Sequence, residues 1–219
     1  MKVLVLDVET TVQISYEYDD EENKKKKIKD GSPFNPLNKL VSCNWRKIED
    51  GLIGPDQHSI YYHRDCNTPD KPDALQEALD WADLVVAHNA KFDVMWLLES
   101  GFKLPSQVYC TYIGEYIQAR GTNVELALEV VAERRDVTRK KSDIINEYTD
   151  QDIWFDQIPI PIVLEYADAD VLSCAEIFLQ QMEDWKKPEN LSLNNIVELM
   201  NDMLWFIVAI ERNGVAIEL

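Results

Sequence analysis

Four carboxylates occur at three places along this sequence, as Asp7 with Glu9, as Asp93 and as Asp170. If the fold gathers them at one place they repel one another, so a cation is needed to hold them ionised. Carboxylate oxygens suit Mg²⁺ or Mn²⁺, whereas zinc prefers nitrogen and sulfur ligands. Two such ions about 3.5 to 4 Å apart can clamp the attacking and leaving oxygens of an in-line phosphoryl displacement. These residues therefore predict metal-dependent cleavage of a phosphodiester.

The first two acids follow a short apolar run. Residues 2–6 have the composition and length of a buried central strand, and we expect that strand to end at Asp7 and Glu9. Alternation along an extended chain places both acids on the same side. Taken alone, this pattern also fits a turn at a strand end with solvated acids.

Asp93 follows a second apolar run. Residues 84–87 predict another buried strand, Asn89 is a candidate helix cap in its exit turn, and residues 91–99 predict an amphipathic helix. Asp93 should then lie in the first turn of that helix, at the edge of the sheet. Acids are common at this position because of the helix dipole, so a purely structural role fits the segment equally well.

The last acid lies in a stretch with helical periodicity, residues 161–182. Tyr166 and Asp170 are four residues apart and share one helical face. Asp168 lies roughly 200° around the helix from Asp170, which makes it the poorer ligand candidate. A tyrosine one turn before a metal-binding acid can hold or polarise a water molecule, although ordinary surface residues can have the same spacing. The ordered combination of three patterns is more specific than any one of them.

In this combination the chain resembles the DEDD superfamily of exonucleases, in its tyrosine-containing (DEDDy) branch. The resemblance is carried by three motifs, Asp7-x-Glu9, Asn89-x-x-x-Asp93 and Tyr166-x-x-x-Asp170. The sister branch has a histidine five residues before the last acid, where this chain has Glu165. The resemblance covers about residues 1–185 and implies an α/β, ribonuclease H-like fold, with a mixed five-stranded sheet flanked by helices. It also implies removal of nucleotides from a 3′ end.

The resemblance further implies a role for each site residue. Asp7, Glu9 and Asp170 would bind a first metal ion. Asp7 would also bridge to a second ion, which Asp93 would hold largely through water. Tyr166 would orient the attacking water, which the first metal helps to deprotonate. The implied cofactors are two divalent cations, Mg²⁺ or Mn²⁺.

Four further residues match family positions near the substrate strand, namely Thr10, Asn89, Lys91 and Phe92. The backbone amide of Thr10 could contact the terminal nucleotide, and Lys91 could contact a phosphate. Phe92 is the nearest aromatic residue that could separate the final bases. Packing within its own helix is the simpler explanation for Phe92.

The C-terminal part narrows the choice within the branch. Residues 193–212 have helical periodicity and run into Asn213 and Gly214. Residues 203–215 resemble the long helix and turn that lead from the proofreading domain into the polymerase domain of family A DNA polymerases. An Asn-Gly cap would end many unrelated helices in the same way. We therefore predict an exonuclease domain over residues 1–186 and a helical connector over residues 187–219, in a phage-like enzyme.

Composition limits the remaining possibilities. A chain of 219 residues can bury one substantial core and a small appended helix. We find no apolar run long enough for a membrane span and no signal-peptide pattern, so we expect a soluble cytoplasmic protein, in the host cytoplasm if a phage encodes it. The cysteines, Cys43, Cys66, Cys110 and Cys174, lack paired spacing and should be reduced.

A zinc site at His58, His63 and Cys66 lacks a second ligand cluster, so a strand over residues 59–62 is the better interpretation.

The net charge of −18 opposes binding to nucleic acid, and we expect free binding to DNA to be weak and sensitive to salt. The one basic cluster could contact a strand or could be a solvated helix end; it comprises Arg134, Arg135, Arg139, Lys140 and Lys141. Attachment to a polymerase would reduce the affinity that is needed, because the tether supplies effective concentration.

The remaining elements follow from local patterns. Residues 16–31 should form an exposed hairpin or a mobile loop, and residues 142–158 an irregular aromatic flap beside the site. We also expect strands over residues 39–45 and 107–110, and helices over residues 73–81, 111–120 and 124–134.

Three functions remain open. The leading one is a proofreading 3′-to-5′ DNA exonuclease that acts on a single-stranded 3′ end and releases nucleoside 5′-monophosphates, with a family A polymerase domain in cis or as a separate chain. The second is an RNA 3′ exonuclease like the ribonuclease D group, which the polymerase-like C-terminal helix disfavours. The third is a non-catalytic structural or interaction module of a polymerase. The presence of all four carboxylates and of the tyrosine argues against this third function.

Overall fold

A computed structural model describes residues 1–19, 24–64, 72–139 and 142–214. Some sequence predictions lie outside these residues: Cys66 of the rejected zinc site, Lys140 and Lys141 of the basic cluster, and residues 215–219 of the connector.

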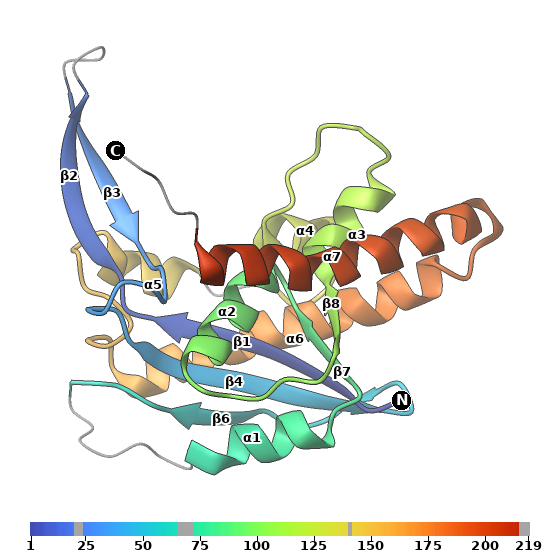
Figure 1. Cartoon of the computed structure of the whole chain (residues 1–219), viewed down its shortest axis with the longest axis horizontal. Coiled ribbons are helices and arrows are strands. Elements are labelled where there is room, and N and C mark those ends of the chain that lie inside the picture. The colour runs from blue at the N-terminus through green and yellow to red at the C-terminus, as the bar shows by residue number, and fades with distance from the viewer. Residues whose placement is uncertain (20–23, 65–71, 140–141, 215–219) are drawn as a thin grey trace.

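A mixed sheet forms the centre of the protein (Figure 1). Its order is β5-β4-β1-β7-β8, with β6 also paired to β4. β4 is antiparallel to β1, β5 and β6, whereas β1, β7 and β8 run parallel. The strands are β1 (Val3–Thr10), β4 (Leu40–Glu49), β5 (Leu52–Ile53), β6 (Gln57–Ile60), β7 (Leu84–Ala87) and β8 (Gln107–Cys110). The predicted mixed sheet is confirmed, and β5 is an additional two-residue strand, too short to give a periodic signal.

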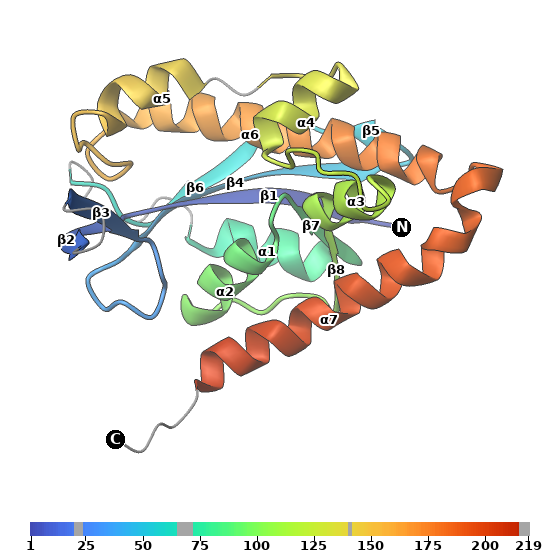
Figure 2. The ribbon, with the colours of Figure 1, turned by 90° about the horizontal axis from the view of Figure 1, so that it is seen from above.

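Helices cover both faces of this sheet (Figure 2). On one face lie α4 (Leu128–Arg135), α5 (Ser142–Thr149) and α6 (Ile160–Asp184), and α3 (Thr111–Gln118) lies at the edge of the sheet between the two helix layers. On the other lie α1 (Pro72–Trp81), α2 (Lys91–Glu99) and α7 (Asn194–Asn213), with the 3-10 helix η1 (Pro188–Leu193) joining α6 to α7.

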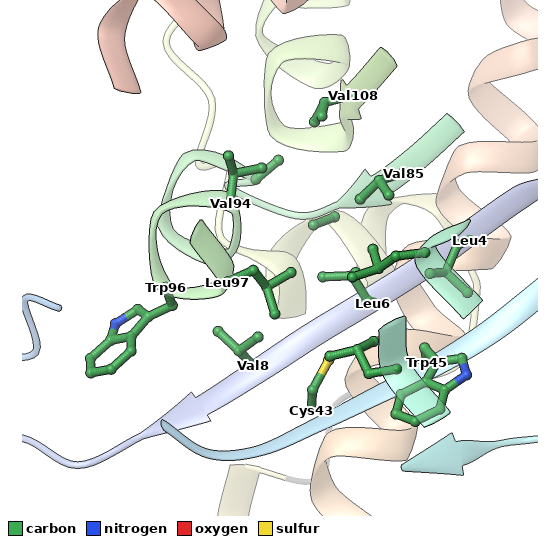
Figure 3. Close-up of a cluster of buried hydrophobic side chains, with 14 of the residues drawn as sticks. Leu4, Leu6, Val8, Cys43, Trp45, Val85, Val94, Trp96, Leu97 and Val108 are labelled. Atoms are coloured by element: carbon green, nitrogen blue, oxygen red, sulfur yellow. The ribbon is translucent and has the colours of Figure 1, made fainter. Parts of the chain in front are cut away.

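Alternation along β1 divides the core between the two faces. Leu4, Leu6 and Val8 pack with α1, α2 and α7, as Figure 3 shows for part of this cluster. Val3 and Val5 pack against α6. The α6 face of β1 continues through its next two alternate residues, which are the acids of the first motif.

The predicted exposed hairpin is confirmed. β2 (Gln13–Asp19) and β3 (Lys24–Asp30) form a separate two-stranded antiparallel sheet that extends away from the central one (Figure 1). Lys27 on β3 forms an ion pair with Asp152, and the Lys29 ammonium lies 4.8 Å from the centre of the Trp154 ring. The hairpin is therefore anchored to the segment that follows α5.

The first strand, which we expected to end at Asp7 and Glu9, extends one residue further, because pairing with β4 continues to Thr10. Two other segments differ more from the predictions. Residues 142–149 are not irregular but form α5, since Ile145 is buried against α6 and the segment before it. Asn89 does not cap α2: the cap position is Ala90, without a side-chain cap, and Asn89 adopts a left-handed conformation with φ 65°.

The C-terminal helical stretch differs from expectation in one respect. Residues Pro188–Asn213 are long and apolar enough to cross a membrane by length and composition, which the sequence analysis did not foresee. Val197, Asn201, Leu204 and Val208 of this stretch are buried in the fold, however, and Asn201 accepts a hydrogen bond from the Cys110 amide at 2.7 Å. The stretch thus packs as part of the domain.

Candidate metal centre

Three of the four predicted carboxylates converge between β1 and α6. One ligand oxygen from each of Asp7, Glu9 and Asp170 lies within 4.8 Å of the other two. Glu9 and Asp170 are buried, and Asp7 is partly exposed. β1 brings Asp7 and Glu9 to the same face because side chains alternate along a strand. α6 lies over that face and carries Asp170 among its buried residues. The site is therefore formed by one strand and one helix that are far apart in the sequence.

Asp93 lies beside this group and makes a different contact. It is buried in the first turn of α2, where the sequence placed it. Its Oδ1 accepts a hydrogen bond from the Val8 amide at 3.1 Å. β7 pairs with β1 in parallel but ends at Ala87, before it could supply a backbone acceptor to Val8. The Asp93 carboxylate supplies that acceptor instead. Burial, followed by the nearby charge of Asp7, raises the pKa of Asp93 well above its usual range.

Tyr166 lies one helical turn before Asp170 and is also buried. Its hydroxyl is hydrogen-bonded to the Asp170 carboxylate, and its ring lies 5.7 Å from that of Phe155, centre to centre. Burial raises the pKa of Tyr166, and the charges of Glu9, Asp170 and Asp7 raise it further. The hydroxyl therefore stays protonated at neutral pH and acts as a hydrogen-bond donor.

Asp168 is directed elsewhere, as the helical angle predicted. Its Oδ1 accepts hydrogen bonds from Arg46 Nε at 2.9 Å and from Nη2 at 2.5 Å. This pair is only partly exposed.

The predicted substrate residues fall into two groups. Asn89, Lys91 and Phe92 line an open pocket of about 400 Å³ between α2 and the segment that follows β3. Phe92 also packs against the core cluster of α1, α2 and α7, in agreement with the simpler explanation. Thr10 is buried at the end of β1, after an irregularity in pairing between Glu9 and Thr10.

Lys91 has a contact that the sequence could not show. Its Nζ lies 2.7 Å from Oε1 of Glu211 on α7, and both side chains are about two-fifths exposed. Arg212 and Glu99 form a second ion pair between the same two helices at 2.6 Å.

The basic cluster was interpreted wrongly in its buried part. Arg135 is neither a solvated helix end nor available to nucleic acid, because its side chain is 11% exposed and pairs with Glu115 and Asp184. Arg134 donates to the same Glu115 at 2.8 Å, and Arg139 lies 3.6 Å from Glu133 at the surface. A buried glutamate on another helix determines this arrangement, and no local pattern indicates it.

The other candidate ligands make ordinary contacts. His63 is hydrogen-bonded to the Ile158 carbonyl at 2.8 Å, and His58 lies near Asp56. Cys43, Cys110 and Cys174 are buried free thiols. Among the described residues, Asp7, Glu9 and Asp170 form the one group of three potential metal ligands.

Sequence reasoning missed two polar residues on β4, Ser42 and Asn44, which pair with Glu9 and Asp7 across the sheet. A signal was available, because these polar residues alternate with Val41, Cys43 and Trp45 in the first half of the strand.

Comparisons with known proteins identify the family and the fold. Residues 53–184, more than half of the chain, match the family model for the 3′-5′ exonuclease, DNA_pol_A_exo1. The matched segment contains Asp93, Tyr166 and Asp170 but begins after Asp7 and Glu9. No curated protein sequence matches the chain.

Solved structures show the same fold. A structure described as the apo form of a nuclease has a TM-score of 0.66 at 16% identity, over 97% of this chain and 85% of that one. Brucella melitensis NrnC with bound Mg²⁺ has a TM-score of 0.63 at 17% identity, over 97% and 86%. A family B DNA polymerase from Pyrobaculum calidifontis has a TM-score of 0.50 at 17% identity, over 84% of this chain and 25% of that one. The protein thus has the ribonuclease H-like fold of 3′-5′ exonucleases.

Proposed function

The chain belongs to the 3′-5′ exonuclease family, and on that premise we propose that it is a metal-dependent, proofreading DNA exonuclease. It would hydrolyse the phosphodiester at a single-stranded 3′ end and release nucleoside 5′-monophosphates. The observation that carries the proposal is the convergence of Asp7, Glu9 and Asp170 within 4.8 Å, with Tyr166 hydrogen-bonded to Asp170.

The donor set fits a hard divalent cation. Two of the three converging carboxylates are buried, and such a group repels itself unless a cation or a proton lies among its members. All the donors are oxygens, which favours Mg²⁺ or Mn²⁺ over zinc. Asp7, Glu9 and Asp170 would hold one ion, and Asp7 together with Asp93 a second. When bound, the ions would stabilise the charge that develops on the attacking and leaving oxygens.

The protein groups would position the reactants. Tyr166 stays protonated, so its role is to orient the attacking water and not to remove a proton from it. The contact of its ring with Phe155 limits the positions that the hydroxyl can take. The hydrogen bond from the Val8 amide fixes the position of the Asp93 carboxylate in the folded chain. Asp93 would therefore bind the second ion from farther away than Asp7 does, through water.

The substrate strand would enter through the pocket beside α2. Lys91 would contact a phosphate and Asn89 the strand, and Phe92 would limit the pocket at its core side. The amide of Thr10 would contact the terminal nucleotide. The overall charge of −18 fits weak binding of DNA by the isolated domain, with transfer of a frayed end from an attached polymerase.

We also propose that residues 1–186 are the exonuclease domain and that residues 187–219 connect it to a family A polymerase domain, in cis or as a separate chain. The family model is named for A-type DNA polymerases. One side of α7 also exposes an apolar stripe that a further domain would cover; it comprises Ile196, Leu199, Met203, Phe206, Ile207 and Ile210.

The test is digestion of 5′-labelled single-stranded DNA and of RNA of the same sequence, with Mg²⁺ or Mn²⁺ and with Asp7→Ala as the control. We expect a metal-dependent ladder that shortens from the 3′ end of the DNA and is lost in Asp7→Ala. A preference for RNA would replace proofreading by RNA trimming. No cleavage of either substrate by wild-type protein at high concentration would reject the nuclease assignment for the isolated chain.

A further inference from the structure

Two polar side chains on β4 lie opposite the carboxylates of β1. In the antiparallel register Asn44 pairs with Asp7, and Ser42 pairs with Glu9. Residues directly opposite in such a pair project from the same face, with Cβ atoms about 5 Å apart. Ser42 and Asn44 therefore lie on the α6 face of the sheet, beside the proposed metal centre.

Both side chains are buried with a polar atom left over. Ser42 is 1% exposed and Asn44 is 0% exposed. Ser42 Oγ and Asn44 Oδ1 have no hydrogen-bond partner among the described residues. Native proteins seldom leave buried polar atoms in this state unless water or an ion completes them. The two atoms belong to neighbouring residues on the same face of β4, and each residue lies opposite a candidate metal ligand. We therefore expect the same water or ion cluster to complete both atoms.

The amide of Asn44 has a defined orientation. Its Nδ2 donates weakly to Asp56 Oδ1 at 3.4 Å and to the Leu164 carbonyl at 3.5 Å. Asp56 immediately precedes β6, on the side of β4 away from β1. The amide nitrogen is therefore directed at Asp56 and α6, and the amide oxygen is the atom left without a partner. An oxygen of this kind can accept a hydrogen bond from a water molecule but cannot bond directly to an ionised carboxylate.

We propose that Ser42 and Asn44 are positioning residues of the metal centre. This rests on the proposed function, because it requires a hydrated divalent cation at Asp7, Glu9 and Asp170. The Asn44 amide oxygen and the Ser42 hydroxyl bind water molecules of that cation, since Mg²⁺ in proteins usually retains several waters. Outer contacts of this kind set the orientation and affinity of a metal site.

The test compares Ser42→Ala and Asn44→Ala with Ser173→Ala, a matched control. Ser173 is a buried serine whose hydroxyl donates to the Thr138 carbonyl, so it has its partner within the protein. Thermal unfolding is measured in EDTA and with saturating Mn²⁺, and the Mn²⁺ dissociation constant is measured by calorimetry. None of these readouts depends on nuclease activity.

We expect Ser42→Ala to unfold in EDTA at the wild-type temperature or above, because no protein hydrogen bond is lost. Its Mn²⁺ dissociation constant should rise about tenfold, and so should that of Asn44→Ala. Ser173→Ala should show the opposite behaviour, with a lower unfolding temperature in EDTA and the wild-type Mn²⁺ affinity.

The possible failures are distinguishable. If wild-type protein binds Mn²⁺ and Asp7→Ala does not, but Ser42→Ala and Asn44→Ala retain the wild-type affinity, the positioning role is rejected and the metal centre stands. If wild-type protein shows no Mn²⁺ binding, the metal centre is rejected together with this assignment.

Discussion

Replacing Asp170 by Asn should stabilise the metal-free protein, although it removes a proposed ligand. Asp170 is buried, and its carboxylate lies within 4.8 Å of the carboxylates of Asp7 and Glu9. The amide of Asn keeps the shape of the side chain and an oxygen that can accept the hydrogen bond of Tyr166. The substitution therefore removes charge repulsion and little else.

The magnitude follows from the separation. Two unit charges 4.8 Å apart repel by about 3.5 kcal/mol at an effective dielectric constant of about 20. The total repulsion energy from both neighbours has an upper limit, because the three carboxylates can instead bind one proton. Binding that proton costs about 4 kcal/mol at pH 7 for an acid with a pKa near 4. Partial exposure of Asp7 lowers the repulsion further. We expect Asp170→Asn to raise the free energy of unfolding in EDTA by about 2 to 4 kcal/mol, or the melting temperature by at least about 4 °C.

The assay is urea and thermal unfolding in EDTA and in Mg²⁺, with Asp168→Asn as the control on the same helix. Asp168 pairs with Arg46, so its replacement should lower stability by about 1 kcal/mol with or without metal. In Mg²⁺ the order of wild type and Asp170→Asn should reverse, because only wild type gains the full binding free energy. An Asp170→Asn protein that is no more stable than wild type in EDTA would refute the repulsion argument.

Three further predictions concern neighbouring groups. The pKa of Asp93 is raised in the folded state, so this carboxyl binds more protons in the folded protein than in the unfolded chain. The free energy of unfolding without metal should therefore fall as pH rises from about 4 through the folded pKa. In unfolding experiments across that pH range, Asp93→Asn should show a smaller fall. Tyr166→Phe should lower kcat about 10- to 100-fold with little change in KM, and an unchanged kcat would remove its hydroxyl from the mechanism. Glu211→Gln should free Lys91 and lower KM for single-stranded DNA up to about fivefold at low salt, whereas Lys91→Ala should raise it; equal KM values in all three proteins would exclude Lys91 as a phosphate contact.

The parts of the site that could be predicted from the sequence depend on short-range geometry. Strand alternation placed Asp7 and Glu9 on one face, and the four-residue spacing placed Tyr166 beside Asp170. The same angular argument excluded Asp168, which the structure pairs with Arg46. These relations hold within single elements, so tertiary contacts did not change them.

The parts that failed depend on partners distant in the sequence. The hydrogen bond from Val8 to Asp93 exists because β7 ends where it does, and the burial of Arg135 depends on Glu115 of α3. Residues 142–149 were predicted to be irregular because eight residues give a weak periodic signal, and the packing of Ile145 on α6 stabilises that helix. Propensity and pattern alone cannot supply such information.

The ion pairs of α7 bear on how a polymerase domain would be arranged. Lys91–Glu211 and Arg212–Glu99 join the C-terminal end of α7 to α2, the helix that carries Asp93 and lines the proposed substrate pocket. In the proposed two-domain arrangement, a domain that follows α7 would therefore begin beside the pocket and not on the opposite face of the sheet. If Lys91 contacts a strand phosphate as proposed, that phosphate would have to compete with Glu211, and occupancy of the pocket would be coupled to the attachment of α7. Each exposed pair contributes little, up to about 1 kcal/mol, so such competition would cost the substrate little binding free energy.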